Sequence, residues 1–269
     1  MKADFRFAKR RFMTQALNAR QIAILSQIRQ SGRVFVDNLS EAFATTPQTI
    51  RRDLQILADT GEVMRFHGGA SLPAGVEYTG FDIRSTIAAE QKEAIGKAVA
   101  ARIPDNTVVM INGGTTTAAV GRALRNHAGL KVLVDNVNIG NDLRNNPGIE
   151  VMVPGGILRR SDGAILGESA VDFIRQFRAD IAVVGAAAID DNGALLDFDL
   201  GEVHVTRAMI DCAKHVILAA DASKFDRSAP VCIGHLGQVH TLVTDRCANA
   251  AIAALCQHHE VELVEAQPA

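Results

Sequence analysis

The sequence TPQTIRRDLQIL at residues 46–57 decides how the first quarter of the chain folds. Its opening threonine and proline are typical of a helix start, because a threonine side chain caps free backbone amides and a proline at the first helical position loses no hydrogen bond. Ile50, Leu54 and Leu57 then recur at helical spacing and predict one buried stripe. The opposite side of this helix presents glutamine and arginine side chains.

Two further helices are expected before this one. Apolar residues at helical spacing predict a helix over residues 19–31, with Gly32 as its stop. Asp37 is expected to cap a second, shorter helix, and a tight turn at Ala44-Thr45 joins that helix to residues 46–57. Its inner face is predicted to consist of Leu39, Ala42 and Phe43. This succession is the helix-turn-helix arrangement, which places one helix in the major groove of DNA.

A β-hairpin is expected next and completes a winged helix-turn-helix domain over residues 19–73. Residues 63–66 and 70–72 are predicted to be strands around the turn His67-Gly68-Gly69. Glutamine and arginine side chains can bind base edges, and threonine hydroxyls can bind phosphates, so the exposed side of the third helix is expected to contact DNA. The alternative is that this side of the helix is only solvated. The candidate contacts to double-stranded operator DNA are Thr46, Gln48, Thr49, Arg51, Arg52, Gln55, Arg65 and His67.

The charge is distributed unequally along the chain. Residues 1–72 carry 11 Lys and Arg against 6 Asp and Glu, a net charge of +5, and residues 73–269 carry 17 against 24, a net charge of −7. A basic module for a polyanion, joined to an acidic domain with another task, is the natural interpretation. Residues 1–18 are expected to be a flexible basic tail, or sequence upstream of a start at Met13.

Composition excludes several classes of protein. The longest apolar runs fall far short of the roughly 20 residues that span a bilayer, so no membrane association is expected. The four cysteines form no Cys-x-x-Cys pair, which argues against a zinc site or a disulfide framework and favours the cytoplasm. With no Trp and one Tyr, the chain is poor in platforms for stacking single-stranded bases.

The rest of the chain is predicted to be an α/β domain. Residues 74–103 are expected to form a linker with a polar connecting helix from about Asp82 to Arg102. Across residues 104–265, short apolar runs alternate with helical stretches, which predicts a mainly parallel sheet. The expected strands are residues 107–111, 132–134, 150–153, 180–184, 215–219, 241–243 and 261–264.

Ligands of such domains bind beyond the carboxyl ends of the strands, where this sequence has glycine-rich loops. The sequence NGGTTT at residues 112–117, before a helix expected near Ala118, offers backbone amides, hydroxyls and a positive helix end, as a phosphate site requires. A plain tight turn is the alternative, and the loop matches neither the P-loop nor the dinucleotide fingerprint. Three other loops at the carboxyl ends of strands offer further groups for a ligand. They contain Asp135-Asn136, Gly155-Gly156 followed by Arg159 and Arg160, and Lys224 after the strand at 215–219. The candidate effector-binding residues are Gly113, Gly114, Thr115, Thr116, Asn136, Gly155, Gly156 and Lys224.

Two motifs in the first domain, TIRRDL at residues 49–54 and RFHGGA at 65–70, resemble the signature of DeoR-type bacterial transcriptional regulators. The resemblance extends from about residue 18 to residue 264. The loop at 113–116, Asn136, Gly155-Gly156 and the sequence SKF at 223–225 resemble the sensor domain of that family. The resemblance therefore implies a fold similar to ribose-5-phosphate isomerase and a phosphorylated sugar or polyol as effector. Three positions depart from the family, which usually has an acidic residue, Thr and Gly where Asn112, Asp135 and Asp226 stand.

The resemblance also implies how the protein works. Residues 163–169, 172–178 and 195–203 are most similar to the branch of the family that responds to glycerol 3-phosphate, with another sugar phosphate as the alternative. A repressor that leaves its operator when this effector binds is therefore expected. Two half-sites read by a symmetric pair of winged helices imply a homo-oligomer. No cofactor, metal or catalytic residue is expected.

Two other functions compete with this interpretation. An aldose–ketose isomerase would need a carboxylate base and a group that stabilises the enediolate, and Glu202 or Asp199 with Lys224 could take these roles. The attached DNA-binding module makes catalysis an unnecessary hypothesis, since a sensor only has to bind. A DNA-binding architectural protein with a merely structural second domain is disfavoured by the phosphate-like loop.

Overall fold

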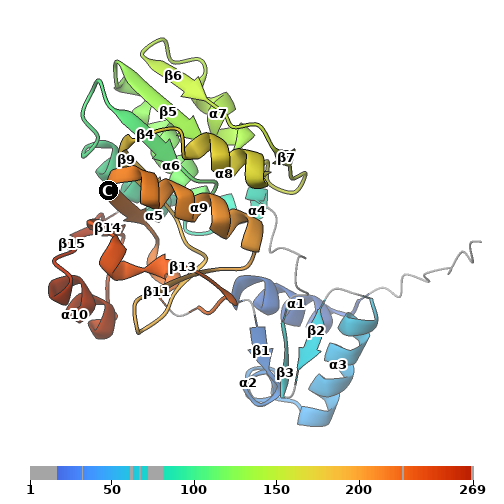
Figure 1. Cartoon of the computed structure of the whole chain (residues 1–269). Helices are drawn as coiled ribbons and strands as arrows, with labels where there is room; N and C mark the ends of the chain where they lie inside the picture. Colours follow the sequence, from blue (N-terminus) through green and yellow to red (C-terminus); the bar gives the residue numbers. More distant parts are fainter. Residues whose placement is uncertain are drawn as a thin grey trace, which may run out of the picture. The chain divides into compact units, whose positions relative to one another are not determined.

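The computed structural model describes residues 17–31, 33–60, 63–66, 68–71, 81–225 and 227–267. The chain divides into two compact units, residues 1–73 and 74–269 (Figure 1). Most of the expected tail, Gly32, residues 61–62, His67, residues 72–80 with the start of the expected linker, Asp226 and residues 268–269 lie outside the described residues. None of the described helices has both the length and the apolar composition that crossing a membrane requires.

The described part of the first unit contains three helices and a small antiparallel sheet with the strand order β1-β3-β2. The elements are α1 (Ala19–Ser31), β1 (Arg33–Phe35), α2 (Val36–Ala42), α3 (Pro47–Asp59), β2 (Met64–Phe66) and β3 (Gly69–Ser71). Helix α3 starts as its sequence predicts, because the Thr46 hydroxyl oxygen accepts a 3.2 Å hydrogen bond from the amide of Thr49. The predicted stripe of Ile50, Leu54 and Leu57 is fully buried against residues of α1 and α2.

Helix α2 differs from its prediction. It begins at Val36, directly after β1, so Asp37 lies within its first turn and does not cap it. Val36 and Leu39 are its buried residues, whereas Ala42 is exposed. The sequence showed no sign of β1, since three residues are too short for a periodic pattern, and the pairing of β1 with β3 shifted the helix start.

The second unit is built on a parallel sheet with the strand order β15-β14-β12-β9-β4-β5-β6. Its strands are β4 (Val108–Ile111), β5 (Leu130–Val134), β6 (Ile149–Met152), β9 (Ala179–Val184), β12 (Ala213–Ala219), β14 (Thr241–Thr244) and β15 (Glu262–Glu265). Its helices are α4 (Phe81–Thr86), α5 (Ala89–Ala100), α6 (Thr115–Ala123), α7 (Val137–Leu143), α8 (Glu168–Ile174), α9 (Leu200–Cys212) and α10 (Ala250–His258). All the predicted strands are present, with ends that differ by a residue or two.

Smaller elements surround this sheet. Strands β7 (Ile157–Leu158) and β8 (Ile165–Leu166) form a hairpin. Strands β10 (Ala188–Ile189), β11 (Ala194–Asp197) and β13 (Val231–His235) form a separate antiparallel sheet. The short 3-10 helices are η1 (Leu124–Asn126), η2 (Ala222–Lys224) and η3 (Leu236–Gln238).

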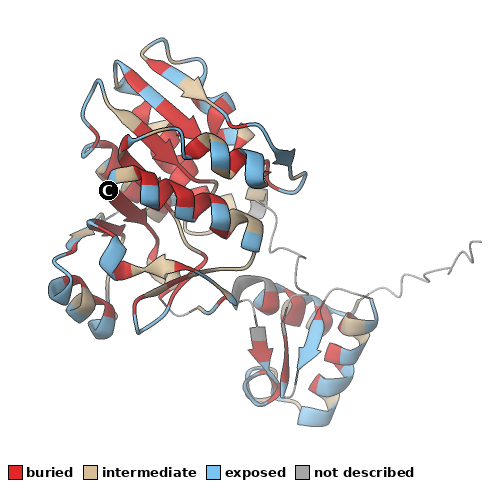
Figure 2. Cartoon of the chain, in the orientation of Figure 1, coloured by how far each residue is buried: buried red, intermediate tan, exposed pale blue. Residues whose placement is uncertain are grey.

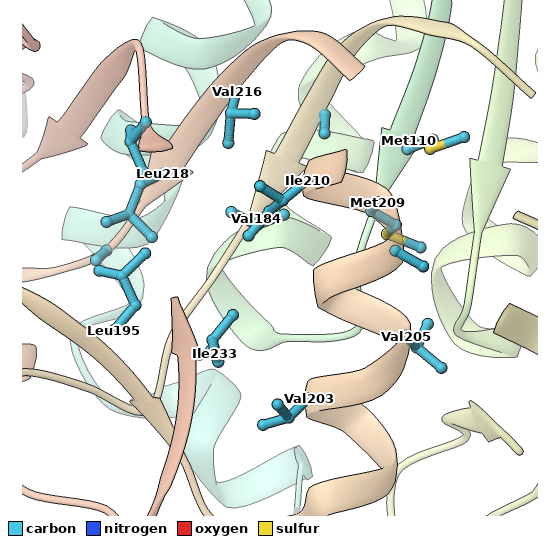
Figure 3. Close-up of a cluster of buried hydrophobic side chains, with 14 of the residues drawn as sticks. Met110, Val184, Leu195, Val203, Val205, Met209, Ile210, Val216, Leu218 and Ile233 are labelled. Atoms are coloured by element: carbon cyan, nitrogen blue, oxygen red, sulfur yellow. The ribbon is translucent and has the colours of Figure 1, made fainter. Parts of the chain in front are cut away.

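Both faces of the parallel sheet are covered by helices, because alternate residues of each strand point to opposite faces. Val109 and Ile111 of β4 pack in a cluster with residues of α5, α6 and α7. Met110, between them, packs in a second cluster with Val205 and Met209 of α9 (Figure 3). The central strands are therefore almost wholly buried (Figure 2).

The direction in which successive strands are added to the sheet reverses at β4. From β4 the chain adds β5 and then β6 on one side, and β9 on the other side of β4. The loops that follow β4 and β9 consequently diverge, which leaves a crevice at the carboxyl ends of these strands. The fold therefore provides one preferred position for a ligand.

Two helix predictions in this unit were wrong. The expected connecting helix from Asp82 to Arg102 is two helices, α4 and α5, separated at Ala88, whose φ of 51° is left-handed. Lys92, expected on a polar surface, is only 5% exposed. Helix α6 begins at Thr115 and not near Ala118, so the three threonines of the loop lie in its first turn.

Candidate functional site

The predicted DNA-binding residues lie mostly on the exposed side of α3 (Figure 2). A groove of about 610 Å³ runs between this side of α3 and the start of α1. It brings together four predicted contacts, Thr46, Gln48, Thr49 and Arg52, whereas Arg51 and Gln55 are exposed outside it. The groove is lined by Asn18, Arg20, Gln21, Thr46, Gln48, Thr49, Arg52, Asp53 and Ile56.

A buried carboxylate joins the two helices that form this groove. Asp53, 3% exposed, accepts hydrogen bonds from Arg20 Nε at 2.6 Å and from Gln21 Nε2 at 2.9 Å. These bonds satisfy both carboxylate oxygens, as a buried charge requires. Asp53 therefore fixes the start of α1 against α3, a role that the sequence alone did not reveal.

Strand β2 places a second cation beside α3. Arg65 Nη1 donates a 2.6 Å hydrogen bond to Gln55 Oε1, and Gln55 Nε2 donates a 2.8 Å bond to Asp59. All residues of β2 are exposed. The structure thus brings Arg65 and Gln55 into contact, but Arg65 is not among the residues that line the groove. His67, the other predicted contact of the hairpin, lies outside the described residues.

In the second unit, a small cavity lies at the reversal point of the sheet. Its volume is about 40 Å³, and the loops after β4 and β9 and the end of β12 contribute to its walls. It brings together Gly113, Gly114, Thr115, Thr116 and Lys224, as predicted for effector binding, but not Asn136, Gly155 or Gly156. We call it the effector cavity, lined by Arg84, Gly113, Gly114, Thr115, Thr116, Thr117, Gly185, Ala186, Ala187, Asp197, Glu202, Ala219 and Lys224.

The loop after β4 is fixed by its own polar groups. Asn112 joins the ends of β4 and β9, because its Oδ1 accepts the amide of Gly185 at 2.9 Å and its Nδ2 donates to Thr206 Oγ1 at 3.2 Å. The Thr117 hydroxyl donates to the carbonyl of Asn112 at 2.7 Å. In the described part of the chain, the hydroxyls of Thr115 and Thr116 have no such partner, although both residues are buried. They remain available to a ligand at the positive end of α6.

Positive charge accumulates beside this loop. Lys92 and Lys224 interact electrostatically with each other, with Arg84 and with Arg227, and Asp221 is the nearby carboxylate. Burial, assisted by the neighbouring cations and opposed by Asp221, lowers the pKa of each lysine to about 8. Burial alone would raise the pKa of Asp221, but Lys224, Ser223 and Lys92 hold it below its usual range. A bound anion would relieve the repulsion within this cluster.

Carboxylates form another wall of the effector cavity. Asp197 ends β11, and Glu202 lies in the first turn of α9. Arg159 binds Asp162 at 2.5 Å and also binds Glu202, while Asp199 lies 3.7 Å from its Nη1. The guanidinium of Arg159 is thus surrounded by carboxylates. Its position after Gly155-Gly156 had suggested a contact to an anionic ligand, but the guanidinium is not directed to one.

Two of the three predicted residues outside the effector cavity, Asn136 and Gly156, have structural roles. Asn136 caps α7, since its Oδ1 accepts the amides of Asn138 and Ile139, and its Nδ2 donates to the carbonyl of Asp162 at 2.9 Å. Gly155 is exposed. A Cβ on Gly156 would lie 2.5 Å from the carbonyl oxygen of Leu166, so this glycine permits the close approach of the β7–β8 hairpin.

Asp135, at the end of β5, is an unusual neighbour of the loop after β4. Its Oδ1 is buried without a hydrogen-bond partner in the described part of the chain. Burial raises the pKa of Asp135 to about 7, an effect that the backbone amide of Gly113 opposes and nearby Asp162 reinforces. Among the described residues, no group of three or more His, Cys, Asp or Glu is arranged to hold a metal ion.

Sequence reasoning missed several residues of the effector cavity. Arg84 was hidden in the expected connecting helix, and Gly185 in the loop after β9 has no glycine neighbour to draw attention to it. Asp197 belonged to a stretch that resembles the sensor domain, but it was not predicted as a contact. The useful signal would have been topological, because β9 lies next to β4 only in the folded sheet.

Together, the exposed helix of a winged helix-turn-helix unit and an anion-attracting cavity in an α/β unit define a DNA-binding protein with a ligand-sensing domain. Residues 20–75 match the family model of the DeoR-like helix-turn-helix domain, and residues 87–246 match that of the DeoR C terminal sensor domain. The chain belongs to the DeoR family of transcriptional regulators, so it is a regulator and not an enzyme.

Curated relatives cover nearly the whole chain. The glycerol-3-phosphate regulon repressor of Escherichia coli (strain K12) is 39% identical over 244 residues, which are 91% of this chain and 97% of the relative. The repressor of the same name from Haemophilus influenzae is 41% identical over 232 residues, 86% of this chain and 90% of the relative. The HTH-type transcriptional repressor CsqR of Escherichia coli (strain K12) is 38% identical, over 92% of this chain and 95% of the relative.

Solved structures are more distantly similar. A ribose-5-phosphate isomerase in complex with phospho-erythronic acid is 18% identical, with a TM-score of 0.38 over 51% of this chain and 54% of that chain. The translation initiation factor eIF-2B of Pyrococcus horikoshii OT3 is also 18% identical, with a TM-score of 0.43 over 78% of this chain and 81% of that chain.

Proposed function

We propose that this protein is a transcriptional repressor that binds operator DNA through α3 and β2 and is released by glycerol 3-phosphate bound in the effector cavity. The observation that carries the proposal is the meeting of the first turn of α6 with Lys224 and Arg84. This arrangement supplies amides, hydroxyls and cations, the groups that bind a phosphate. Two relatives named glycerol-3-phosphate regulon repressor support the choice of effector.

Each end of glycerol 3-phosphate has a matching wall in the effector cavity. The phosphate fits the amides of Gly113 and Gly114, the hydroxyls of Thr115 and Thr116, and the ammonium of Lys224. The glycerol hydroxyls fit Asp197 and Glu202, which accept hydrogen bonds. In this assignment Asn136 and Gly156 support the surrounding loops, and none of Asn136, Gly155 and Gly156 touches the effector.

The size of the effector cavity gives a reason for release. Its volume of about 40 Å³ is far below the roughly 300 Å³ at which small-molecule pockets begin. In this proposal glycerol 3-phosphate binds a conformation with a wider cavity. An effector that binds one conformation better shifts the population toward it, and a 100-fold loss of operator affinity corresponds to roughly 2.7 kcal/mol of coupling.

The test measures operator binding and effector binding with the full-length protein. An operator duplex is selected from random sequences by the purified protein, and its release is followed by fluorescence anisotropy during titration with glycerol 3-phosphate, glycerol and ribose 5-phosphate. We expect release by glycerol 3-phosphate and not by glycerol. Release only by ribose 5-phosphate would contradict the named effector, and failure to bind any duplex would contradict the function.

Variants test the residues assigned to the phosphate. Thr116→Val and Lys224→Ala should each lower the calorimetric affinity for glycerol 3-phosphate tenfold or more, because hydrogen bonds to a charged group contribute about 1.5–3 kcal/mol. Lys131→Ala is the matched control, since Lys131 is exposed on β5 and lies near Glu150. Unchanged affinity in both cavity variants would contradict the assignment.

A further inference from the structure

We propose that Arg84 is both a ligand of the effector phosphate and the residue that transmits effector binding toward the DNA-binding unit, with Lys92 as the positioning residue that couples Arg84 to the sensor core. This inference rests on the proposed function. Beyond the proposed function, it assigns to Arg84 the transmission of effector binding to the DNA-binding unit, a role that a residue that only binds the effector does not have.

The first step is the position of Arg84 in the effector cavity. Arg84 lies on α4 and lines the cavity together with the loop at 113–117 and Lys224. It also belongs to the cluster of cations that lowers the pKa of Lys92 and Lys224. A guanidinium binds a phosphate through two parallel hydrogen bonds, so Arg84 is suited to the same anion as Lys224.

The second step is the position of α4 in the chain. Helix α4 starts at Phe81 and is the first described element after residues 72–80, which join the two units along the chain. Among the walls of the effector cavity, it is therefore the one nearest in sequence to the DNA-binding unit. The other walls follow strands β4, β9 and β12 or belong to α9 and the small antiparallel sheet.

The third step is the attachment of α4 to the sensor core. The ammonium of Lys92 donates hydrogen bonds to the carbonyls of Arg84 at 2.6 Å and Ile87 at 2.7 Å. In a continuous helix, backbone amides would satisfy these two carbonyls. Here the ammonium of Lys92 takes their place and holds the end of α4 and the break before α5. Lys92 is itself fixed, because α5 packs closely on α6, where a Cβ on Gly96 would lie 2.7 Å from the backbone of Ala119.

These steps explain which wall yields when the effector enters. Widening the cavity at β4, β9 or β12 would disturb the buried sheet, and close-packed cores resist such changes. Helix α4 has only six residues: Phe81 at its start packs against the core, and its end is held by the polar attachment through Lys92. Effector binding therefore repositions Arg84 and α4, the wall of the effector cavity that lies nearest in sequence to the DNA-binding unit.

The experiment separates transmission from binding. For each protein, operator affinity is measured by anisotropy without glycerol 3-phosphate and at a concentration that calorimetry shows to be saturating, and the ratio of the two is the coupling. Lys224→Ala should bind effector at least tenfold more weakly but keep the parental coupling at saturation. Arg84→Ala should also bind effector more weakly, and its coupling at saturation should fall below about threefold.

Two further variants and a control complete the test. Lys92→Met should lose coupling in the same way, because α4 is then no longer held to α5. Arg84→Lys retains the charge but not the two parallel hydrogen bonds, so its effector affinity should lie between those of the parent and Arg84→Ala. Lys131→Ala should match the parent in every measurement. Thermal melting confirms that each variant is folded. In the parental protein, hydrogen exchange of the amides at residues 81–88 should change when glycerol 3-phosphate binds.

The outcomes distinguish this inference from the proposed function. Full operator release by saturated Arg84→Ala, or unchanged exchange at residues 81–88 in the parent, would overturn the transmission role while effector binding stands. If no phosphorylated polyol causes the parental protein to release the operator, the proposed function is overturned, and the inference with it.

Discussion

At the scale of single residues, Arg52 carries a specific prediction about DNA. Its side chain is exposed on α3 and lines the groove, away from the buried stripe of that helix. Arg52→Ala should cost about 1–3 kcal/mol of operator affinity and relax the base preference at one position, because arginine reads a guanine edge. Competition binding with a set of single-base operator variants measures both effects.

Two other arginines serve as controls for this prediction. Arg65→Ala should weaken binding to all duplexes alike and flatten its salt dependence, because we propose that this cation on β2 contacts the phosphate backbone. Arg125→Ala removes an exposed charge from the sensor unit and should change neither. Parental base preference in Arg52→Ala would show that α3 reads DNA through other side chains.

The lowered pKa values of Lys92 and Lys224 predict how effector affinity depends on pH. Both lysines lose their charge as pH rises through about 8, so affinity for glycerol 3-phosphate should fall above pH 8. It should also fall below about pH 6, where the phosphate gains a proton. Calorimetry from pH 5.5 to 9.5 should give a maximum between these limits. Lys224→Gln should bind more weakly at pH 7 and show a shallower alkaline decline, whereas an affinity constant up to pH 9.5 would contradict this account.

Asp135 predicts a pH-dependent contribution to stability. Its pKa is about 7 in the folded protein and near 3.8 when unfolded, so the folded state binds the proton more tightly. Stability should therefore fall as pH rises from about 4 to 7. Asp135→Asn removes this effect and should raise the free energy of unfolding at pH 8 by more than about 1 kcal/mol, since one pKa unit corresponds to about 1.4 kcal/mol. Chemical denaturation at pH 4 and pH 8 tests this, and an equal effect at both values would contradict it.

At the scale of elements, the contact between α5 and α6 depends on Gly96. A Cβ there would meet the backbone of Ala119 at 2.7 Å, and backbone atoms of a packed helix cannot move aside cheaply. Gly96→Ala should destabilise the sensor unit by about 1–3 kcal/mol despite the better helix propensity of alanine. Denaturant unfolding measures the loss. Ala98→Gly, on the same helix at a partly buried position, controls for propensity alone.

Elements with a local pattern could be predicted from the sequence. Helix α3 was predicted because its cap and apolar stripe lie within a dozen residues, and the parallel strands were predicted because each is a short apolar run. The break at Ala88 could not be predicted, since an alanine gives no sign of a left-handed backbone and the hydrogen bonds of Lys92 depend on tertiary packing. The effector cavity was predicted only at the glycine-rich loop after β4 and at Lys224, where the sequence has a local signature. Arg84 and Asp197 enter it through the packing of distant segments.

At the scale of the whole molecule, the two units predict two separable responses to ligands. Residues 1–73 and 74–269 each have their own buried core. A ligand at 100 times its dissociation constant stabilises the unit that binds it by about 2.7 kcal/mol. Scanning calorimetry should show operator DNA raising the melting temperature of the smaller unit and glycerol 3-phosphate that of the larger one. A single transition that both ligands shift equally would contradict this prediction.

The walls of the effector cavity come from separate stretches of chain. Arg84, the loop after β4 and Lys224 form the cationic part, whereas Asp197 and Glu202 come from β11 and α9. A mutation within residues 194–202 therefore leaves the cationic part intact. If the cavity binds its effector as we propose, a duplicated gene can acquire a new inducer by changes confined to these few codons, because the residues proposed to bind the phosphate and to transmit the response stay unchanged.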